Sequence, residues 1–362
     1  MRKRQCVLVV FCMIGMTMWA QVGWLVKAVK SVGTFLDSAA VKGVDPHYIT
    51  APKQPWQLIA RYNMDRIDVT MHSNYDLDES IPGLDLELIS NLRTNTSNRV
   101  GLWLGYRGYG IGYSTEVGKG TGTFFTVSAT GGCYGVNLRM RTFATRELDM
   151  TVKIGDELPI DGDKGELPDP IRIRSLMIDG FYFFNKKHFS YMAAYDQSAI
   201  QIRSAGSLMV GAKWHHSTIR YESDRNAAYV SLMREVGTIK VRQGSLGVGY
   251  AYNWVPFKGF LANATVMPML TVYNSQKSEL YDTYIDEDID IKDNDQVFYR
   301  ESVYHHSPVS FTYYARVSLT YNWNRFFVNA YGQWNRFNYD NGEEGHGRIK
   351  DWFVNTSVGV RF

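Results

Sequence analysis

Acidic residues crowd residues 279–295, and three of them repeat the spacing of a calcium-binding loop. The stretch reads ELYDTYIDEDIDIKDND and holds eight acids and one lysine. Asp286, Asp288 and Asp290 match the first three ligand positions of an EF-hand, but the glycine and the glutamate that such a loop also needs are missing. We interpret the stretch as an exposed, solvated charge run, with weak divalent-cation binding by the three aspartates as the alternative.

Two pairs of adjacent histidines, His215-His216 and His305-His306, are further candidates for metal binding or catalysis. Consecutive residues of a strand point to opposite faces, so neither pair can chelate one ion unaided. A hydrolase also needs a nucleophile and a base within hydrogen-bond reach, and no arrangement such as Gly-x-Ser-x-Gly is recognisable. We therefore expect no catalytic residue, no cofactor and no enzymatic activity.

The segments that would position such residues alternate between apolar and polar side chains. Residues 310–323 read SFTYYARVSLTYNW, which is longer than the usual soluble strand of about 5–6 residues and fits a tilted transmembrane strand of about 9–11 residues plus its rims. An arginine facing the middle of a bilayer would cost about 2–4 kcal/mol, so Arg316 must face the lumen. The opposite, lipid-facing set is Phe311, Tyr313, Val317, Leu319 and Tyr321.

The last twelve residues, 351–362, repeat this pattern and end on phenylalanine. We expect Asn355 to line the lumen. The lipid-facing set on this strand is Trp352, Val354, Val358, Val360 and Phe362. A terminal phenylalanine on such a strand resembles the carboxyl-terminal signature of bacterial outer-membrane barrels, which implies contact with the barrel-assembly machinery.

The same cost of charge in lipid assigns polar residues on two other segments to the lumen. They are Asn137, Arg139 and Arg141, within 133–144, and Arg172 and Arg174, within 170–184. Two interpretations remain open for the lumen arginines. They can pair with acids on neighbouring strands and fill the barrel, or they can form a basic constriction that passes a small anionic solute. We favour pairing.

Glycine occupies alternate positions in YRGYGIGYS, residues 106–114. Strict alternation from a luminal Arg107 would turn Tyr109 and Tyr113 into the lumen and leave the glycines against lipid. We favour a β-bulge at Arg107 and Gly108, which turns the tyrosines outward and lets the glycines clear space inside the barrel.

The first 20 residues predict export. A basic start is followed by an uncharged apolar run that is too short for a spanning helix of about 20 residues, as in a cleaved signal peptide. We expect residues 1–20 to be the signal, 21–54 a periplasmic amphipathic helix and linker, and 55–362 the barrel. The chain after residue 20 has no net charge, which argues against nucleic acid, and it has one cysteine, which excludes a disulfide scaffold.

Twelve candidate strands can be counted, and the connections after the odd-numbered strands are the long ones. The candidates are 56–72, 84–92, 99–114, 122–130, 133–144, 170–184, 206–221, 239–255, 260–274, 308–323, 325–340 and 351–362. One long connection, 185–205, breaks this rule, and we interpret it as a periplasmic excursion rather than a thirteenth strand. The sequence predicts an all-β, antiparallel, up-and-down transmembrane β-barrel of about 12 strands with a short N-terminal helix.

Several stretches resemble an uncharacterised family of Bacteroidetes outer-membrane proteins, domain of unknown function 4421. They are VDPHYITAPKQPW (44–56), GYRGYGIGYS (105–114), FNKKHFSY (184–191), QIRSAGS (201–207) and GVGYAYNWVPFKGF (247–260). The resemblance implies an outer-membrane barrel without an assigned activity. We expect a narrow pore or a structural surface protein in contact with outer-membrane lipid and lipopolysaccharide. The alternatives are an outer-membrane hydrolase acting at the barrel rim and a soluble exported β-sandwich that binds glycans.

Overall fold

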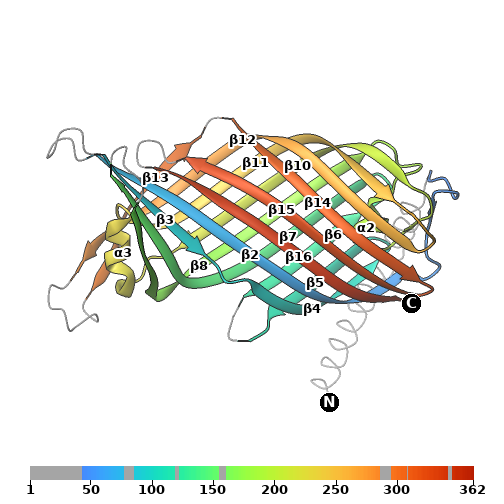
Figure 1. Cartoon of the computed structure of the whole chain (residues 1–362), viewed down its shortest axis with the longest axis horizontal. Coiled ribbons are helices and arrows are strands. Elements are labelled where there is room, and N and C mark those ends of the chain that lie inside the picture. The colour runs from blue at the N-terminus through green and yellow to red at the C-terminus, as the bar shows by residue number, and fades with distance from the viewer. Residues whose placement is uncertain are drawn as a thin grey trace, which may run out of the picture.

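The strands of this chain wind around a long closed barrel (Figure 1). The computed structural model describes residues 43–76, 85–118, 122–154, 160–285, 295–307, 309–340 and 345–362. The predicted signal peptide and N-terminal helix lie outside these residues, as do Asp286, Asp288 and Asp290. Within the described ranges, no helix is long and apolar enough to cross a membrane.

Twelve antiparallel strands of the described residues pair around the ring, which confirms the predicted fold class. In ring order they are β2 (Trp56–Asp76), β4 (Ser97–Tyr106), β5 (Tyr109–Glu116), β6 (Thr123–Thr130), β7 (Tyr134–Ile154), β8 (Ile160–Phe183), β10 (Ala205–Arg220), β11 (Val236–Trp254), β12 (Phe260–Tyr284), β14 (Ser310–Trp323), β15 (Phe326–Asp340) and β16 (Gly345–Arg361). Pairing of β16 with β2 closes the ring. The sheet closes on itself instead of forming two packed layers, so the β-sandwich alternative is wrong.

The predicted count of twelve contains two errors that cancel. The predicted strand 84–92 corresponds to β3 (Asp85–Arg93), which covers only the far part of β2, while β4 continues along the near part. The predicted strand 99–114 is two strands joined by a tight turn, in which Arg107 and Gly108 both have positive φ (50° and 92°). The expected bulge is therefore a hairpin.

The glycines of this hairpin make room for one indole inside the barrel. Trp103 is buried, and a Cβ at Gly110 would lie 2.1 Å from its ring, while one at Gly105 would lie 1.9 Å away. Tyr113 points outward and is 56% exposed, as the bulge argument expected. The wrong backbone feature leads to the right side-chain direction, because a two-residue turn also resets which face each residue occupies.

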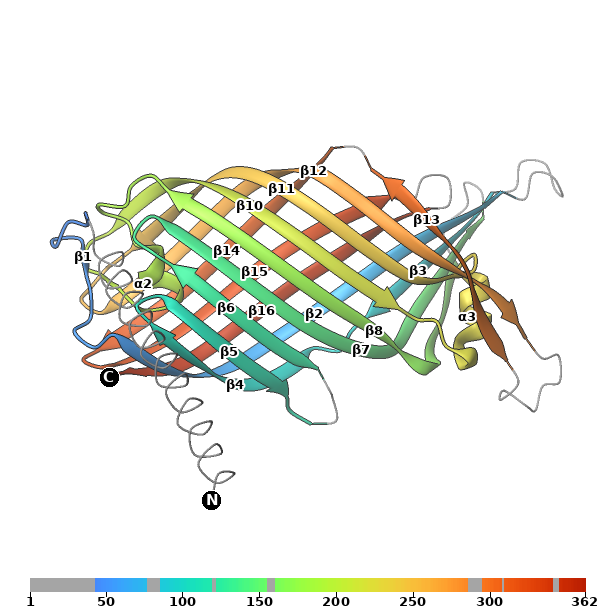
Figure 2. The same cartoon turned by 180° about the vertical axis from the view of Figure 1, so that it is seen from behind.

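Strands β5 and β6 reach only halfway along the barrel (Figure 2). Beyond them β3 pairs directly with β7, with Leu92 opposite Leu148. Three strands therefore separate β2 from β7 in one half of the barrel, and one strand separates them in the other half.

Several strands are far longer than a bilayer requires. β7, β8 and β12 contain 21, 24 and 25 residues, against about 9–11 for a membrane crossing. The predicted loops 145–169 and 275–307 are mostly wall, and β13 (Gln296–His306) pairs with the far part of β12. The predicted loop 222–238 holds a 3₁₀ turn, η1 (Asp224–Asn226), and the short helix α3 (Ala227–Leu232).

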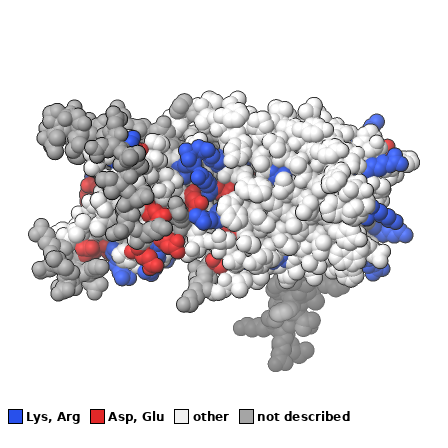
Figure 3. Space-filling view, viewed as in Figure 1, with Lys and Arg blue, Asp and Glu red and all other residues white. Residues whose placement is uncertain are grey.

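Apolar side chains cover the outside of only one half of this wall. We call the end that holds the C-terminus the inner end, and the end that holds α3 the outer end (Figure 1). Along β2 the outward residues Trp56, Leu58, Tyr62 and Met64 are exposed, and Arg66 comes next. Figure 3 shows the resulting uncharged band, with charge beyond it on both sides. A continuous apolar exterior on a closed barrel is the surface that lipid solvates.

Side chains fill the barrel in three layers. One apolar cluster, which we call the inner cluster, packs around the helix α2 (Tyr191–Tyr195) and includes Phe181, Phe183 and Tyr314. A second, which we call the outer cluster, packs under α3 and includes Ile67, Ile171 and Ile349. Between them lies a polar layer of buried charged and amide side chains. Its principal members are Asp65, Arg99, Arg139, Arg141, Asp179, Lys213, His215, Gln333, Asn335 and Asp351.

Candidate functional site

The segment after β8 folds back into the inner mouth of the barrel. Every residue from Phe189 to Ala199 is buried. Helix α2 begins at the cap Ser190, whose hydroxyl accepts a hydrogen bond from the Ala193 amide (3.3 Å). A two-residue strand, β9 (Ile200–Gln201), then pairs with β1 (Ile49–Thr50) across the mouth. The excursion predicted for 185–205 is therefore a plug, which we call the inner plug.

Polar contacts fix the inner plug to the wall. The Tyr195 hydroxyl donates to Asn263 Oδ1 (2.6 Å), and Asn329 Nδ2 donates to the Ala194 carbonyl (3.1 Å). Arg361 Nη2 donates to the Gln197 carbonyl (2.9 Å). Backbone groups buried without partners cost free energy, so these bonds let an irregular segment occupy the interior.

A chain of ion pairs crosses the polar layer. Asp65 lies between two arginines, forming an ion pair with Arg99 and lying 3.6 Å from Arg141. Arg141 also pairs with Asp351, which lies on β16. The side chains of all four residues are at most 1% exposed. Charges buried this deeply are tolerated only when each faces a partner.

Arg139 and Arg316 are held in different ways. Arg139 pairs with Asp179 on the neighbouring strand β8 and donates to Gln333 Oε1. Arg316 donates to the Tyr191 hydroxyl, and its guanidinium lies over the Tyr195 ring, 3.9 Å from the centroid. Arg316 thus connects the wall to the inner plug through aromatic rings instead of a carboxylate.

Sequence reasoning places most of the lumen residues on the correct side, with one correction. Asn137, Arg139, Arg141, Arg316 and Asn355 lie inside the barrel, where Asn355 donates to Asn63 Oδ1 (2.7 Å). Arg172 and Arg174 are exposed on the outside, so their assignment to the lumen is wrong. They lie on the outer half of β8, beyond the apolar band, where Ile171 and Ile173 fill the interior.

The residues expected to face lipid point outward from the wall. Phe311, Tyr313, Val317, Leu319, Tyr321, Val358 and Phe362 are exposed, and Trp352, Val354 and Val360 are half-buried among their neighbours.

The two histidine pairs lie on different parts of the wall. His215 points inward and stacks on Phe337 at 3.9 Å between centroids, while His216 points outward. His305 and His306 lie at the end of β13. His215 and His216 therefore point to opposite faces of the strand, as the period of two requires.

One small cavity lies in the inner half of the lumen. This cavity, among Arg61, Arg139, Arg316 and Asp196, encloses about 30 Å³, which is room for one or two water molecules. Arg61 Nη1 donates to Thr126 Oγ1 (3.2 Å) at its edge. Such a space can hydrate charged groups but cannot hold a solute of any size.

One serine approaches a histidine inside the barrel. Ser175 Oγ lies 3.5 Å from His215 Nε2, which is beyond a good hydrogen bond, and both residues are buried. The packing around Ser175 and His215 keeps both side chains away from solvent. The geometry therefore does not support the alternative of a hydrolase with its centre here.

A family model described as Domain of unknown function (DUF4421) matches residues 44–362. The chain belongs to this family. The DUF4421 protein has no match among curated proteins. Its fold is a closed, all-β antiparallel barrel.

Several solved outer-membrane structures are similar to the DUF4421 protein at low identity. The outer membrane protease OmpT from Escherichia coli is 11% identical, with 86% of this chain and 97% of that chain covered and a TM-score of 0.42. The outer membrane protein OprG from Pseudomonas aeruginosa is 12% identical over 85% and 97% of the two chains, with a TM-score of 0.28. An outer membrane channel from Pseudomonas putida F1 is 12% identical over 88% and 100%, with a TM-score of 0.28. Likeness at this level says nothing about activity.

Proposed function

We propose that the DUF4421 protein is a closed, non-conducting barrel of the bacterial outer membrane that carries a rigid stalk above the lipid. The filling of the lumen is the observation that carries this proposal. The inner plug, the paired charges of the polar layer and the outer cluster follow one another along the barrel axis. A structural surface protein is favoured over a narrow pore, because a pore needs a continuous wet path.

The two ends of the barrel support one orientation. The turns at the inner end are short, as at Arg107-Gly108 and Asn324-Arg325, and short turns are periplasmic in such barrels. Phe362, which follows β16, lies at this end: it is 54% exposed and exchanges backbone hydrogen bonds with Trp56 (3.0 and 3.1 Å). We infer that the inner end is periplasmic and that the barrel-assembly machinery meets the final strand. Export with a cleaved signal peptide belongs to the same proposal.

Basic side chains border the apolar band on its outer side. Arg336 and Lys350 are directly opposite each other on β15 and β16, and Arg66 lies near them on β2. Arg174 and Lys240 occupy a corresponding level on β8 and β11. Outer-leaflet lipopolysaccharide carries phosphate groups that such cations can pair with, so this border supports contact with lipopolysaccharide.

Planar-bilayer recording tests closure. Purified, refolded protein should add no steady current above that of the bare membrane, while an open porin recorded in parallel should conduct. Repeated single-channel steps of fixed size from the wild-type protein would contradict the proposal, even if the barrel is fully folded.

Cysteine labelling on intact cells tests orientation. In a Cys133→Ser background, Arg300→Cys on the outer wall should react with a membrane-impermeant maleimide. Lys258→Cys, in an exposed turn of the inner end, should react only after lysis. The reverse labelling pattern would contradict the proposed orientation.

A further inference from the structure

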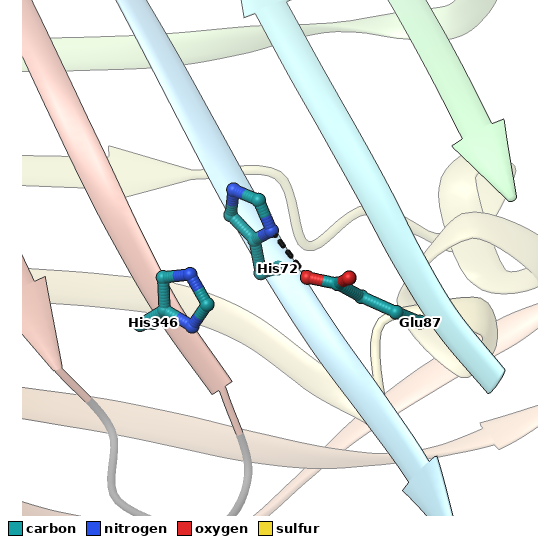
Figure 4. A group of neighbouring side chains, drawn as sticks. All are labelled: His72, Glu87 and His346. Carbon is teal, nitrogen blue, oxygen red and sulfur yellow. Dashed lines mark hydrogen bonds and ion pairs between the residues drawn. The ribbon is translucent and has the colours of Figure 1, made fainter. Parts of the chain in front are cut away.

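Two histidines and a glutamate meet on the outside of the outer half. His346, His72 and Glu87 come from the adjacent strands β16, β2 and β3 (Figure 4). His346 lies directly opposite His72 in the ladder, and Glu87 lies opposite Asn74, two residues further along the same face of β2. Direct and diagonal cross-strand neighbours are the pairs whose side chains can touch.

The ligand atoms of these three side chains converge. One nitrogen from each histidine and one oxygen of Glu87 all lie within 4.8 Å of one another. His72 Nδ1 is 2.6 Å from Glu87 Oε1, and the two imidazole rings stack with centroids 4.2 Å apart and planes at 14°. Metal–nitrogen and metal–oxygen bonds of about 2.0–2.2 Å place ligand atoms a little over 3 Å apart, so small side-chain rotations suffice.

The site is accessible and its frame is rigid. The side chains of His72 and Glu87 are 23% and 25% exposed, and His346 is exposed. All three residues are paired in the ladder, His346 and Glu87 near the ends of their strands, and this pairing fixes their Cα positions better than a loop would. Lys153 Nζ lies 4.0 Å from Glu87 Oε2 and is 40% exposed, so it can withdraw when a cation binds.

We propose that His72, Glu87 and His346 bind one divalent transition-metal ion, with Zn²⁺ the best match. Two imidazoles and one carboxylate suit Zn²⁺ and leave the fourth tetrahedral position for water. The site lies outside the apolar band: His72 is eight positions beyond Met64 on β2, which is roughly 26 Å of strand. The inference does not depend on whether the lumen conducts.

Calorimetric titration of the refolded full chain with ZnCl₂ tests the site. The wild-type protein should take up one equivalent of Zn²⁺. His346→Asn and Glu87→Gln should each weaken this binding at least about tenfold, because each removes one of three protein ligands. His306→Asn, at another histidine of the outer wall, should bind as the wild type does.

Cobalt provides a second readout that a merely structural role would not change. Co²⁺ added to the wild type should give visible ligand-field absorption, and the double variant His72→Asn/His346→Asn should give none. An unboiled gel shows for each variant whether the closed barrel has formed, since its mobility changes only on heating. The proposal is overturned if the wild type binds no Zn²⁺ at millimolar concentration, or if folded ligand variants bind it as tightly as the wild type.

Discussion

The wall of this barrel reverses its polarity between the level of the polar layer and the outer half. Around the polar layer the outside is apolar and the inside holds ion pairs such as Asp65–Arg99. In the outer half the outside carries Arg172 and Arg174, and the inside is an apolar core. Strands such as β2 and β8 run through both halves, and each carries its apolar residues on the outside in one half and on the inside in the other.

This reversal teaches that alternation identifies a strand but does not say which of its two faces points inward. The apolar face points outward in one half and to the interior in the other. The comparison can be broken or sharpened by matched substitutions, one on each side of the boundary.

The largest effect is expected at Asp65. Asp65→Asn removes a carboxylate that faces both Arg99 and Arg141 in the buried layer, and leaving a buried charge without its partner costs about 3–5 kcal/mol. Asp68→Asn, three residues along β2, breaks only the half-exposed pair with Arg66 and should cost about 0–1 kcal/mol. Urea unfolding of the refolded proteins, followed by tryptophan fluorescence, measures both. Equal losses would mean that the polar layer is no more demanding than the surface.

The second comparison uses two apolar residues of β16. Ile349 is fully buried in the outer cluster, and Ile349→Ala should cost about 2–5 kcal/mol because it opens a cavity. Val358 is exposed on the apolar band, and Val358→Ala should change the free energy of unfolding by about 0.5 kcal/mol or less. The same unfolding assay applies. A large loss at Val358 with none at Ile349 would place the core in the wrong half.

Charge placement gives the third comparison. Val317→Arg puts a guanidinium on the outward face in the middle of β14 and should cost about 2–4 kcal/mol in lipid vesicles. Arg174→Val, on the outward face of the outer half, should stay within about 0.5 kcal/mol of the wild type. If Val317→Arg is tolerated in vesicles, the apolar band does not face lipid.

The smallest effect is expected from pH on the outer wall. Burial tends to raise the pKa of the Glu279 carboxyl, but hydrogen bonds from Lys240 and Lys277 outweigh it and lower this pKa below its ordinary value. A lowered folded-state pKa contributes stability above the unfolded pKa near ~4.3, and that stability is lost as pH falls through the folded value. The stability difference between wild type and Glu279→Gln should therefore be at most about 1 kcal/mol at neutral pH and vanish in acid. A difference that grows on acidification would reverse the sign.

Local pattern predicts the membrane-spanning wall well and the outer wall poorly. The alternation in residues 310–323 predicts β14 residue for residue. The segments 145–169 and 275–307, which were expected to be outer loops, are mostly strand. The pattern is misleading there because charged outward residues resemble a loop when each strand is allowed only the length of a membrane crossing. Arg172 and Arg174 are assigned to the wrong face for the same reason, because a charge on the outward face is costly only where lipid covers the wall.

The filling of the interior is harder to predict because it depends on register. The sequence identifies the lumen arginines, but their partners Asp65, Asp179 and Asp351 come from three different strands. His72, Glu87 and His346 carry no local signal at all, since the first and the last are 274 positions apart in the sequence. Only the pairing of β16, β2 and β3 brings them together.

The half-height hairpin has a consequence for how such a wall changes size. β3 and β4 follow one another along the same edge of β2, and β3 pairs with β7 beyond the point where β5 and β6 end. Without β5 and β6, one strand would separate β2 from β7 along the whole wall, and the inner half would have two strands fewer. The width of the inner half thus depends on a single hairpin, β5 and β6, whose two strands are present or absent together.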